Sequence, residues 1–306
     1  MITTNESDGL VRSGPRTLAD GIEVGPLAFG CWRFTNADVA ESQALIEAAL
    51  DHGMNLIDTA DVYGLDWGGT GFGTNEEILG SVLSAAPGLR DRMVLATKGG
   101  ILPPVPYDQS AAYLRQACED SLRRLQVETI DLYQIHRPDL FAHPADVAAT
   151  LVALRDEGKI REVGVSNFTV AQTDALAALL PFPIATDQPE YSVVHLDPMR
   201  DGTFDRAMQH DRVPLAWSPL GGGRVVSGEG LRPELVAVLD RLAEREGVDR
   251  AAVAMAFVLA HPSAPVVIVG SQRAERLAGA TVALGVHLDR NDCYDIIEAS
   301  EGVPLP

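Results

Sequence analysis

The sequence has few cysteines and no long apolar run, and both features exclude classes of protein. Its three cysteines, Cys31, Cys118 and Cys293, form no CxxC motif, so we expect reduced thiols and a cytoplasmic protein. The longest apolar run, residues 251–260, is far shorter than the roughly 20 residues that cross a membrane as a helix. The polar first residues lack the apolar segment of a signal peptide. We therefore expect neither a membrane protein nor a secreted one.

Basic residues are also scarce. The chain has 24 lysines and arginines against 43 aspartates and glutamates, which gives a formal net charge of −19. A surface this acidic repels phosphate backbones, so we expect no nucleic-acid partner. The sequence contains no GxGxxG motif, and a Rossmann domain is therefore not supported. Any anionic ligand must be held by a local cluster of positive groups.

Short apolar stretches alternate with longer helical stretches along all 306 residues. This alternation is typical of parallel sheets, and eight such units most naturally close into a barrel. We predict an α/β fold, a single (β/α)8 TIM barrel with an N-terminal β-hairpin around Asp20-Gly21 and an extra C-terminal helix. Residues 16–306 would form the barrel and residues 1–15 a flexible tail. The strands are expected at residues 27–30, 56–59, 93–98, 130–136, 163–166, 184–188, 213–217 and 266–269, and the helices at 37–52, 75–84, 110–125, 144–156, 170–180, 204–209, 233–246, 251–259, 274–284 and 292–300.

Three neighbouring predicted strands end in titratable residues or are followed by one: Asp58, Tyr63, Lys98 and His136. Any one of these alone is more often a structural or solvated residue. Four together are harder to explain in that way, because the carboxyl ends of the strands carry the active site in barrel enzymes. We therefore expect these four side chains to share one pocket.

The four side chains suit the protonation of a carbonyl oxygen while a hydride reaches its carbon. A phenol has a pKa of about 10 and is a poor acid at neutral pH. An ammonium group beside it lowers that pKa, and a carboxylate fixes the ammonium group. Asp58 would thus hold Lys98, Lys98 would lower the pKa of Tyr63, and Tyr63 would act as the general acid. His136 would position the substrate oxygen.

Further motifs follow in a fixed order: Gly164-Val165-Ser166-Asn167-Phe168, Gln188, Trp217-Ser218-Pro219-Leu220-Gly221-Gly222-Gly223, and Ile268-Val269-Gly270-Ser271 with Arg273 and Arg276. With these motifs and the four titratable residues, the chain resembles a bacterial aldo-keto reductase from Leu27 to its last helix. The resemblance implies an NADP(H)-dependent oxidoreductase that reduces an aldehyde or ketone to an alcohol, with Tyr63 as general acid.

The resemblance also implies how NADPH or NADP+ would be held. Ser166, Asn167 and Gln188 would bind the carboxamide of the nicotinamide, and Trp217 would stack on its ring. Backbone amides from 218 to 222 would wrap the pyrophosphate, and Ser271, Gln272, Arg273 and Arg276 would bind the 2′-phosphate. Gly279 and Ala280 stand where relatives often contact adenine, which leaves that contact open. The cofactor-binding residues are expected to be Gly30, Cys31, Trp32, Asp58, Ser166, Asn167, Gln188, Trp217, Ser218, Pro219, Leu220, Gly221, Gly222, Arg224, Gly270, Ser271, Gln272, Arg273 and Arg276.

We expect a small carbonyl compound, apolar or aromatic, as the substrate, and a protein that is monomeric or a weak homo-oligomer. The glycine-rich loop 65–74 would form a mobile rim over the pocket. The expected pocket residues are Trp32, Phe34, Trp67, Phe72 and His136.

Three other functions compete with this interpretation. A Schiff-base lyase could use Lys98, but a neutral lysine would be needed. A metal-dependent hydrolase could use Asp58, Asp61, His136 and Asp187, yet no pair of histidines two residues apart supports it, Asp61 is expected to face a loop, and we expect no metal. The serious alternative is a non-catalytic NADP(H)-binding barrel that senses redox state.

Overall fold

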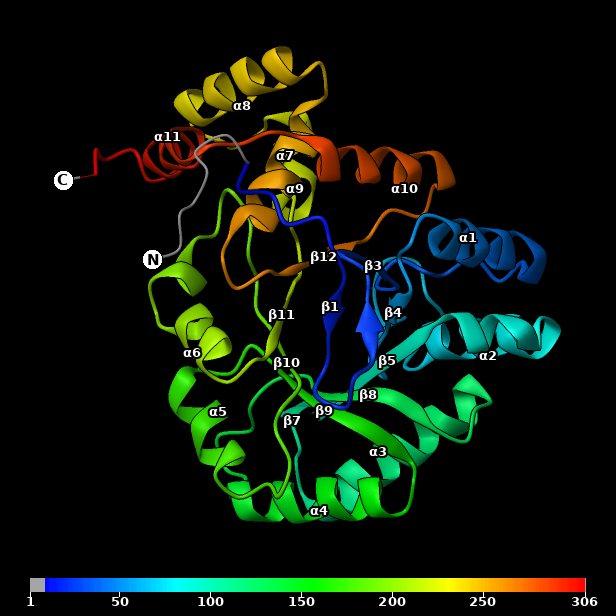
Figure 1. The fold of residues 1–306 in the computed structure, drawn as a ribbon. Coiled ribbons are helices and arrows are strands. Elements are labelled where there is room, and N and C mark those ends of the chain that lie inside the picture. The colour runs from blue at the N-terminus through cyan, green and yellow to red at the C-terminus, as the bar shows by residue number, and fades with distance from the viewer. Residues whose placement is uncertain (1–8, 306) are drawn as a thin grey trace.

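A computed structural model describes residues 9–305 of the protein. Eight parallel strands close into a barrel, which confirms the predicted fold class (Figure 1). The first and last barrel strands in the chain pair with each other, with Val267 opposite Leu27. The barrel strands are β3 (Leu27–Gly30), β4 (Leu56–Asp58), β5 (Val94–Gly99), β8 (Ile130–Ile135), β9 (Ile160–Ser166), β10 (Thr186–Gln188), β11 (Val213–Ala216) and β12 (Val266–Val269).

Helices surround the barrel, and two outer helices, α8 and α11, pack against each other beyond α9 (Figure 1). None of the helices within residues 9–305 is both long enough and apolar enough to span a membrane. The α-helices are α1 (Val39–Asp51), α2 (Thr74–Ala85), α3 (Ala111–Leu125), α4 (Pro144–Asp156), α5 (Val170–Ala177), α6 (Thr203–Gln209), α7 (Arg224–Ser227), α8 (Pro233–Glu246), α9 (Arg250–Ala260), α10 (Ala274–Ala280) and α11 (Arg290–Glu301), and the 3₁₀ helices are η1 (Pro87–Arg92), η2 (Asp197–Met199), η3 (Gly221–Gly223) and η4 (Thr281–Gly285).

Two apolar clusters hold the layers together. Side chains alternate across each strand, so one set fills the barrel and the other packs against the helices. In β4, for example, Leu56 belongs to the interior cluster and Ile57 to the cluster under the helices. The same alternation points Asp58, the next residue after Ile57, toward the barrel interior.

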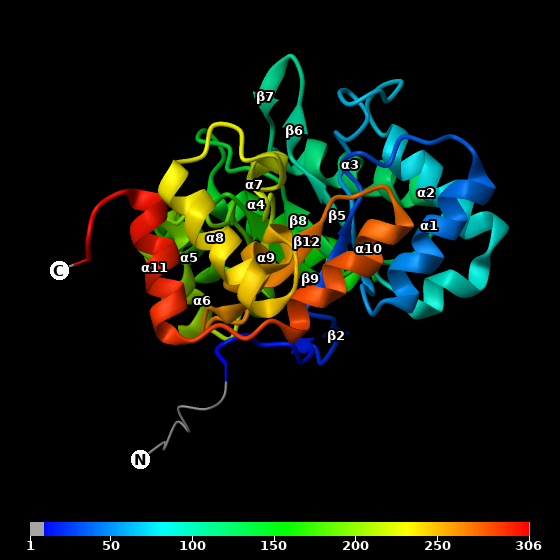
Figure 2. The same cartoon turned by 90° about the horizontal axis from the view of Figure 1, so that it is seen from above.

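The predicted N-terminal hairpin is present as β1 (Arg16–Thr17) and β2 (Glu23–Val24). It lies at the end of the barrel opposite the long loops (Figure 2). Leu18 and Val24 belong to the interior cluster, so the hairpin closes that end. Of the expected tail, residues 1–8 lie outside the described residues. Beyond them, the Leu10 and Arg12 amides donate hydrogen bonds to the carbonyls of Leu288 and Leu259.

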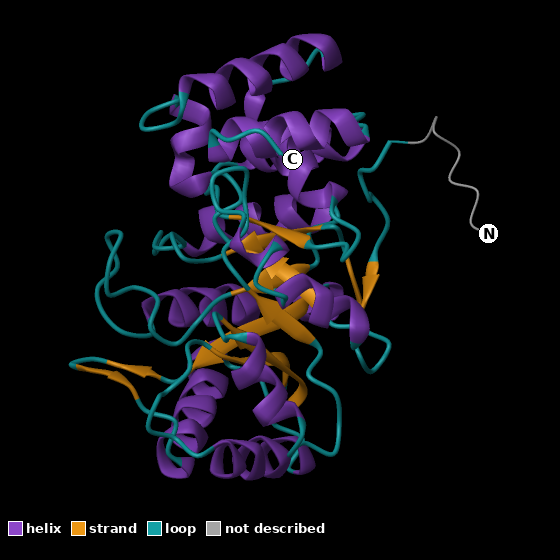
Figure 3. Ribbon diagram, turned by 90° about the vertical axis from the view of Figure 1, so that its left-hand side faces the viewer, coloured by secondary structure: helices purple, strands orange, loops and turns teal. Residues whose placement is uncertain are grey.

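The opposite end of the barrel carries the long loops. A second hairpin, β6 (Ile101–Leu102) with β7 (Val105–Tyr107), projects from it (Figure 3), and so does the loop between β4 and α2 (Figure 2). No pattern in the sequence indicated this hairpin, since its strands are only two and three residues long. The predicted helix 274–284 ends as α10 at Ala280 and continues as the 3₁₀ helix η4.

Candidate active site

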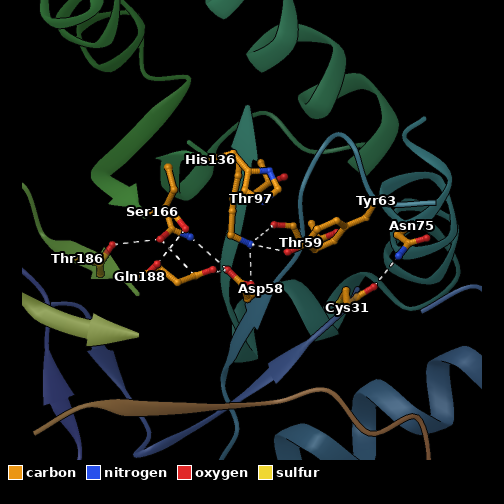
Figure 4. Close-up of polar contacts among 12 residues, drawn as sticks. Cys31, Asp58, Thr59, Tyr63, Asn75, Thr97, His136, Ser166, Thr186 and Gln188 are labelled. Carbon is orange, nitrogen blue, oxygen red and sulfur yellow. Dashed lines mark hydrogen bonds and ion pairs between the residues drawn. The ribbon is translucent and has the colours of Figure 1, made fainter. Parts of the chain in front are cut away.

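The carboxyl ends of β4, β5 and β8 bring the four predicted titratable residues together (Figure 4). Lys98 on β5 is at the centre of the group. Its buried ammonium donates to Asp58 Oδ2 at 2.7 Å, to the Thr59 carbonyl at 2.9 Å and to the Tyr63 hydroxyl at 3.3 Å. All three ammonium hydrogens therefore have acceptors. The Tyr63 ring lies edge-on to the His136 ring, with 5.7 Å between their centroids.

The charges of these groups follow from their surroundings. Burial lowers the pKa of Lys98, but Asp58 and Tyr63 raise it, and the net pKa lies above its ordinary value. Lys98 is therefore held as a cation, which argues against a Schiff-base role. Burial lowers the pKa of His136 well below its ordinary value, so its imidazole is neutral at pH 7.

The pKa of Tyr63 differs from the expectation. Lys98 lowers it, as predicted, but burial acts in the opposite direction and is the larger effect. The pKa of Tyr63 is consequently raised above its ordinary value. Without a ligand, Tyr63 is thus a protonated phenol, ready to donate rather than to accept a proton.

A network of amide side chains supports Asp58 from inside the barrel. Gln134 on β8 donates to Asp58 Oδ1 at 3.2 Å, and Gln188 on β10 donates to the same oxygen at 3.1 Å. Gln134 was not among the predicted site residues, although it lies two residues before His136 and therefore faces the same side of β8. Gly164 leaves room for the network, because a Cβ atom there would lie 2.1 Å from Thr186 Oγ1.

The residues expected to hold the nicotinamide also lie together. Asn167 Nδ2 donates to Ser166 Oγ at 2.8 Å, and Trp217 Nε1 donates to Asn167 Oδ1 at 3.0 Å. The partly exposed Trp217 side chain packs on the interior cluster at the mouth of the barrel. The side-chain nitrogen of Gln188 is already bonded to Asp58, while no donor within residues 9–305 reaches its side-chain oxygen. That oxygen is the atom with which Gln188 could bind a ligand.

The predicted pyrophosphate cradle is smaller than expected. Pro219 has no N–H group, and the Gly221 amide already donates to the Ser218 carbonyl at 2.8 Å. Two of the five expected donors from 218 to 222 are thus not available. The Arg224 guanidinium folds back onto the Gly221 carbonyl at 3.0 Å.

The segment after β12 runs beside the end of β3. Gln272 Nε2 donates to the Gly30 carbonyl at 3.3 Å, and the Cys31 side chain that follows is buried in the core. Ser271 Oγ is buried and has no hydrogen-bond partner within residues 9–305. Arg273 and Arg276 are exposed and form no ion pair within the same residues. These positions leave unused donors for an anion.

The expected pocket aromatics separate in the structure. Trp32 and Trp67 lie side by side on the rim. Phe34, in contrast, is only 1% exposed and packs on Phe29 in the core, because the segment after β3 turns back under the rim. Placing Phe34 in the pocket is therefore wrong. Phe72 faces Arg124 on α3, whose guanidinium carbon lies 5.8 Å from its ring centroid.

Two aspartates considered as metal ligands lie elsewhere. Asp61 is fully buried. Asp187 lies between Thr186 and Gln188, which point into the barrel, so it points out toward Arg212. Within residues 9–305, no three histidine, cysteine or acidic side chains are placed to hold a metal ion.

The chain is similar to known proteins over nearly its whole length. The Aldo/keto reductase family profile matches residues 26–301. A 6-dehydroglucose reductase from Novosphingobium aromaticivorans is 51% identical over 292 residues, covering 94% of this chain and 95% of the relative. One from Agrobacterium fabrum is 36% identical and covers 93% and 97%. An aldo-keto reductase from Klebsiella pneumoniae, solved with NADPH, has a TM-score of 0.80 at 26% identity and covers 96% of each chain. The chain belongs to the aldo/keto reductase family.

Proposed function

We propose that the protein is an NADPH-dependent reductase of aldehydes in which Tyr63 is the general acid. The observation that carries this proposal is the position of the Lys98 ammonium, which contacts both the Asp58 carboxylate and the Tyr63 hydroxyl. A cation fixed in this place stabilises the phenolate that forms when Tyr63 gives up its proton more strongly than it stabilises the neutral phenol.

His136 would complete the site. Its neutral imidazole lies against the Tyr63 ring and can donate one hydrogen bond to a substrate oxygen. The carbonyl oxygen would then lie between the Tyr63 hydroxyl and His136. NADPH, when bound, supplies the hydride that reaches the carbonyl carbon.

The residues present fit this cofactor. The exposed Arg273 and Arg276 and the unpartnered Ser271 hydroxyl suit a 2′-phosphate. Ser166, Asn167 and the Gln188 side-chain oxygen suit a carboxamide, and Trp217 offers a partly exposed ring beside them. The Klebsiella pneumoniae relative was solved with NADPH, which supports the choice.

The substrate class follows from the relatives. Two of them, 51% and 36% identical, are named 6-dehydroglucose reductase. We infer that a sugar carrying an aldehyde in place of its primary alcohol is a substrate of this chain too, in preference to the apolar aldehyde suggested by the rim aromatics alone. The three cysteines are unpaired, which supports the cytoplasmic location. A monomer or weak homo-oligomer remains our expectation.

The proposal is tested by NADPH oxidation with 6-dehydroglucose and with an aromatic aldehyde. Tyr63→Phe should reduce kcat by about 10²–10⁴-fold, the usual contribution of a general acid, while NADPH binding stays nearly unchanged. Tyr294→Phe, an exposed tyrosine on α11, is the matched control and should behave as the wild type. Turnover that survives in Tyr63→Phe would remove Tyr63 from the acid role. Confirmed NADPH binding without turnover on a wide carbonyl panel would favour the redox-sensing barrel.

A further inference from the structure

We propose that Trp32, Arg33, Asp66 and Trp67 form a recognition platform for the ring and hydroxyl groups of a sugar aldehyde. This proposal rests on the proposed function, and it assigns the substrate selectivity of the reductase to two loops on the rim of the barrel. Trp32 and Arg33 follow β3, and Asp66 and Trp67 lie in the loop after β4. A small apolar aldehyde would leave most of this platform unused.

The two indoles form a partly open aromatic surface. Their centroids are 5.2 Å apart and their planes meet at 74°, an edge-to-face arrangement typical of aromatic pairs. Trp32 is 38% and Trp67 53% exposed. A sugar ring presents faces of C–H groups that pack on such rings, and the exposed area leaves room for one.

Arg33 supplies hydrogen-bond donors beside this surface. Its guanidinium carbon lies 4.2 Å from the Trp67 centroid and 5.8 Å from that of Trp32. The guanidinium lies over the Trp67 ring and forms no hydrogen bond or ion pair with any residue from 9 to 305. A stacked guanidinium keeps its N–H groups in its own plane, where they can reach hydroxyl oxygens.

Asp66 supplies acceptors on the same platform. One carboxylate oxygen accepts from Trp32 Nε1 at 3.3 Å, which ties the two loops together. A carboxylate has acceptor sites beyond this one bond, and sugar hydroxyls can donate to them. The adjacent carboxylate and the net charge of −19 disfavour an anionic ligand at Arg33. The platform therefore suits a neutral, polyhydroxylated substrate.

The platform is fixed relative to the acid. Asn75 Nδ2 donates to the carbonyls of Cys31 at 2.6 Å and Trp32 at 3.1 Å. The backbone amide of Asn75 donates to the Tyr63 carbonyl at 3.5 Å. Figure 4 shows Asn75 beside Cys31, with Tyr63 next to them. One residue thus ties the backbone of the Trp32 segment to the backbone of Tyr63.

The Trp67 loop is folded into a defined shape. Trp67 has a φ of +56°, a conformation uncommon for a bulky side chain. The loop closes at Gly64, whose carbonyl accepts from the Gly71 amide, and a Cβ atom on Gly69 would lie 2.2 Å from that carbonyl oxygen. These close backbone contacts define the turn that carries Trp67, whose ring lies beside the Arg33 guanidinium.

The test compares kcat/KM for 6-dehydroglucose with kcat/KM for propanal. In Trp67→Ala and Arg33→Met, the ratio of the two values should fall about tenfold, the size expected from losing one good stacking contact. Arg33→Lys should lose most of the same selectivity, because lysine keeps the charge but not the planar stack. Phe141→Ala is the matched control, since Phe141 is 98% exposed on another rim loop, after β8.

A binding measurement separates this inference from the proposed function. Saturation-transfer NMR with glucose, on the protein mixed with NADP+, should show transfer in the wild type and in Phe141→Ala and little in Trp67→Ala. Such a difference in transfer would support the platform even if no aldehyde were reduced. The lack of aldehyde reduction would refute only the proposed function. An unchanged kinetic ratio with equal transfer in all variants would overturn the platform. A preference for glyceraldehyde 3-phosphate over glyceraldehyde that depends on Arg33 would also overturn the platform. Arg33 would then bind a phosphate rather than sugar hydroxyl groups.

Discussion

Lys98 Nζ lies 2.7 Å from Asp58 Oδ2, and both side chains are almost completely buried. A buried ion pair is expensive to desolvate, and it is stable only when its remaining hydrogen-bonding atoms are also satisfied. Here Gln134 and Gln188 occupy the other carboxylate oxygen, and Thr59 and Tyr63 take the other ammonium hydrogens. The pair thus fixes a cation at the one place where a phenolate would form.

Removing Lys98 should therefore affect both stability and activity. We expect Lys98→Met to lower the free energy of unfolding by about 3–5 kcal/mol, because it leaves the Asp58 carboxylate buried and unpaired. Denaturant unfolding measures this change, and kcat for aldehyde reduction should fall as well. Arg241→Met is the control, since Arg241 and Asp295 form an exposed pair whose loss should cost less than about 1 kcal/mol. Equal losses in the two variants would contradict the structural role of the buried pair.

Arg273 should distinguish the two nicotinamide cofactors. Arg273→Ala is expected to raise the Kd of NADPH about tenfold or more and to change that of NADH little, since only NADPH carries the 2′-phosphate. Titration by protein fluorescence measures both constants. Arg290→Ala, on α11, serves as the control for the general loss of a positive charge. If NADPH and NADH binding weakened equally, Arg273 would not contact the phosphate.

Asp187 should make the stability depend on pH. Burial raises its pKa to about 7, although Arg212 opposes this effect. The folded state thus favours the protonated carboxyl. The stability that this protonation contributes is fully present below pH 4 and is lost as the pH rises toward 7. Asp187→Asn should remove this loss, which is on the order of a few kcal/mol.

Unfolding curves recorded from pH 4 to 8 would test this prediction. The wild type should lose stability relative to Asp187→Asn across the window, whereas the exposed Asp295→Asn should run parallel to the wild type. Parallel curves for Asp187→Asn and the wild type would mean that Asp187 titrates normally in the folded protein.

Gly164 should tolerate no side chain. A Cβ atom there would lie 2.1 Å from Thr186 Oγ1 and 2.9 Å from Gln134 Cγ, so Gly164→Ala should destabilise the fold by about 1–3 kcal/mol through overpacking. The substitution should also lower kcat, because it displaces the amide that supports Asp58. Gly279→Ala is the matched control: no atom lies within 4 Å of its Cβ position on α10, and alanine should stabilise this helix by roughly 0.5–1 kcal/mol. Thermal unfolding of the two variants should shift in opposite directions.

The sequence alone determined the barrel and the order of the residues at its rim. Strand-length apolar segments separated by helices fix a parallel sheet, and a parallel barrel sends every strand end to the same rim. Asp58, Lys98 and His136 could therefore be placed together from the sequence, because each lies at or next to the carboxyl end of a strand. Gln134 could have been found by the same alternation along β8.

Only the tertiary structure decided which way the loop side chains face and which electrostatic effect is larger. Phe34 and Trp32 are two residues apart after the same strand, yet one packs in the core and the other joins Trp67 on the rim. Their directions depend on how two separate loops fold against each other, which no local pattern contains. The pKa of Tyr63 is a balance between burial and the charge of Lys98, and burial exists only once distant segments have packed around the phenol.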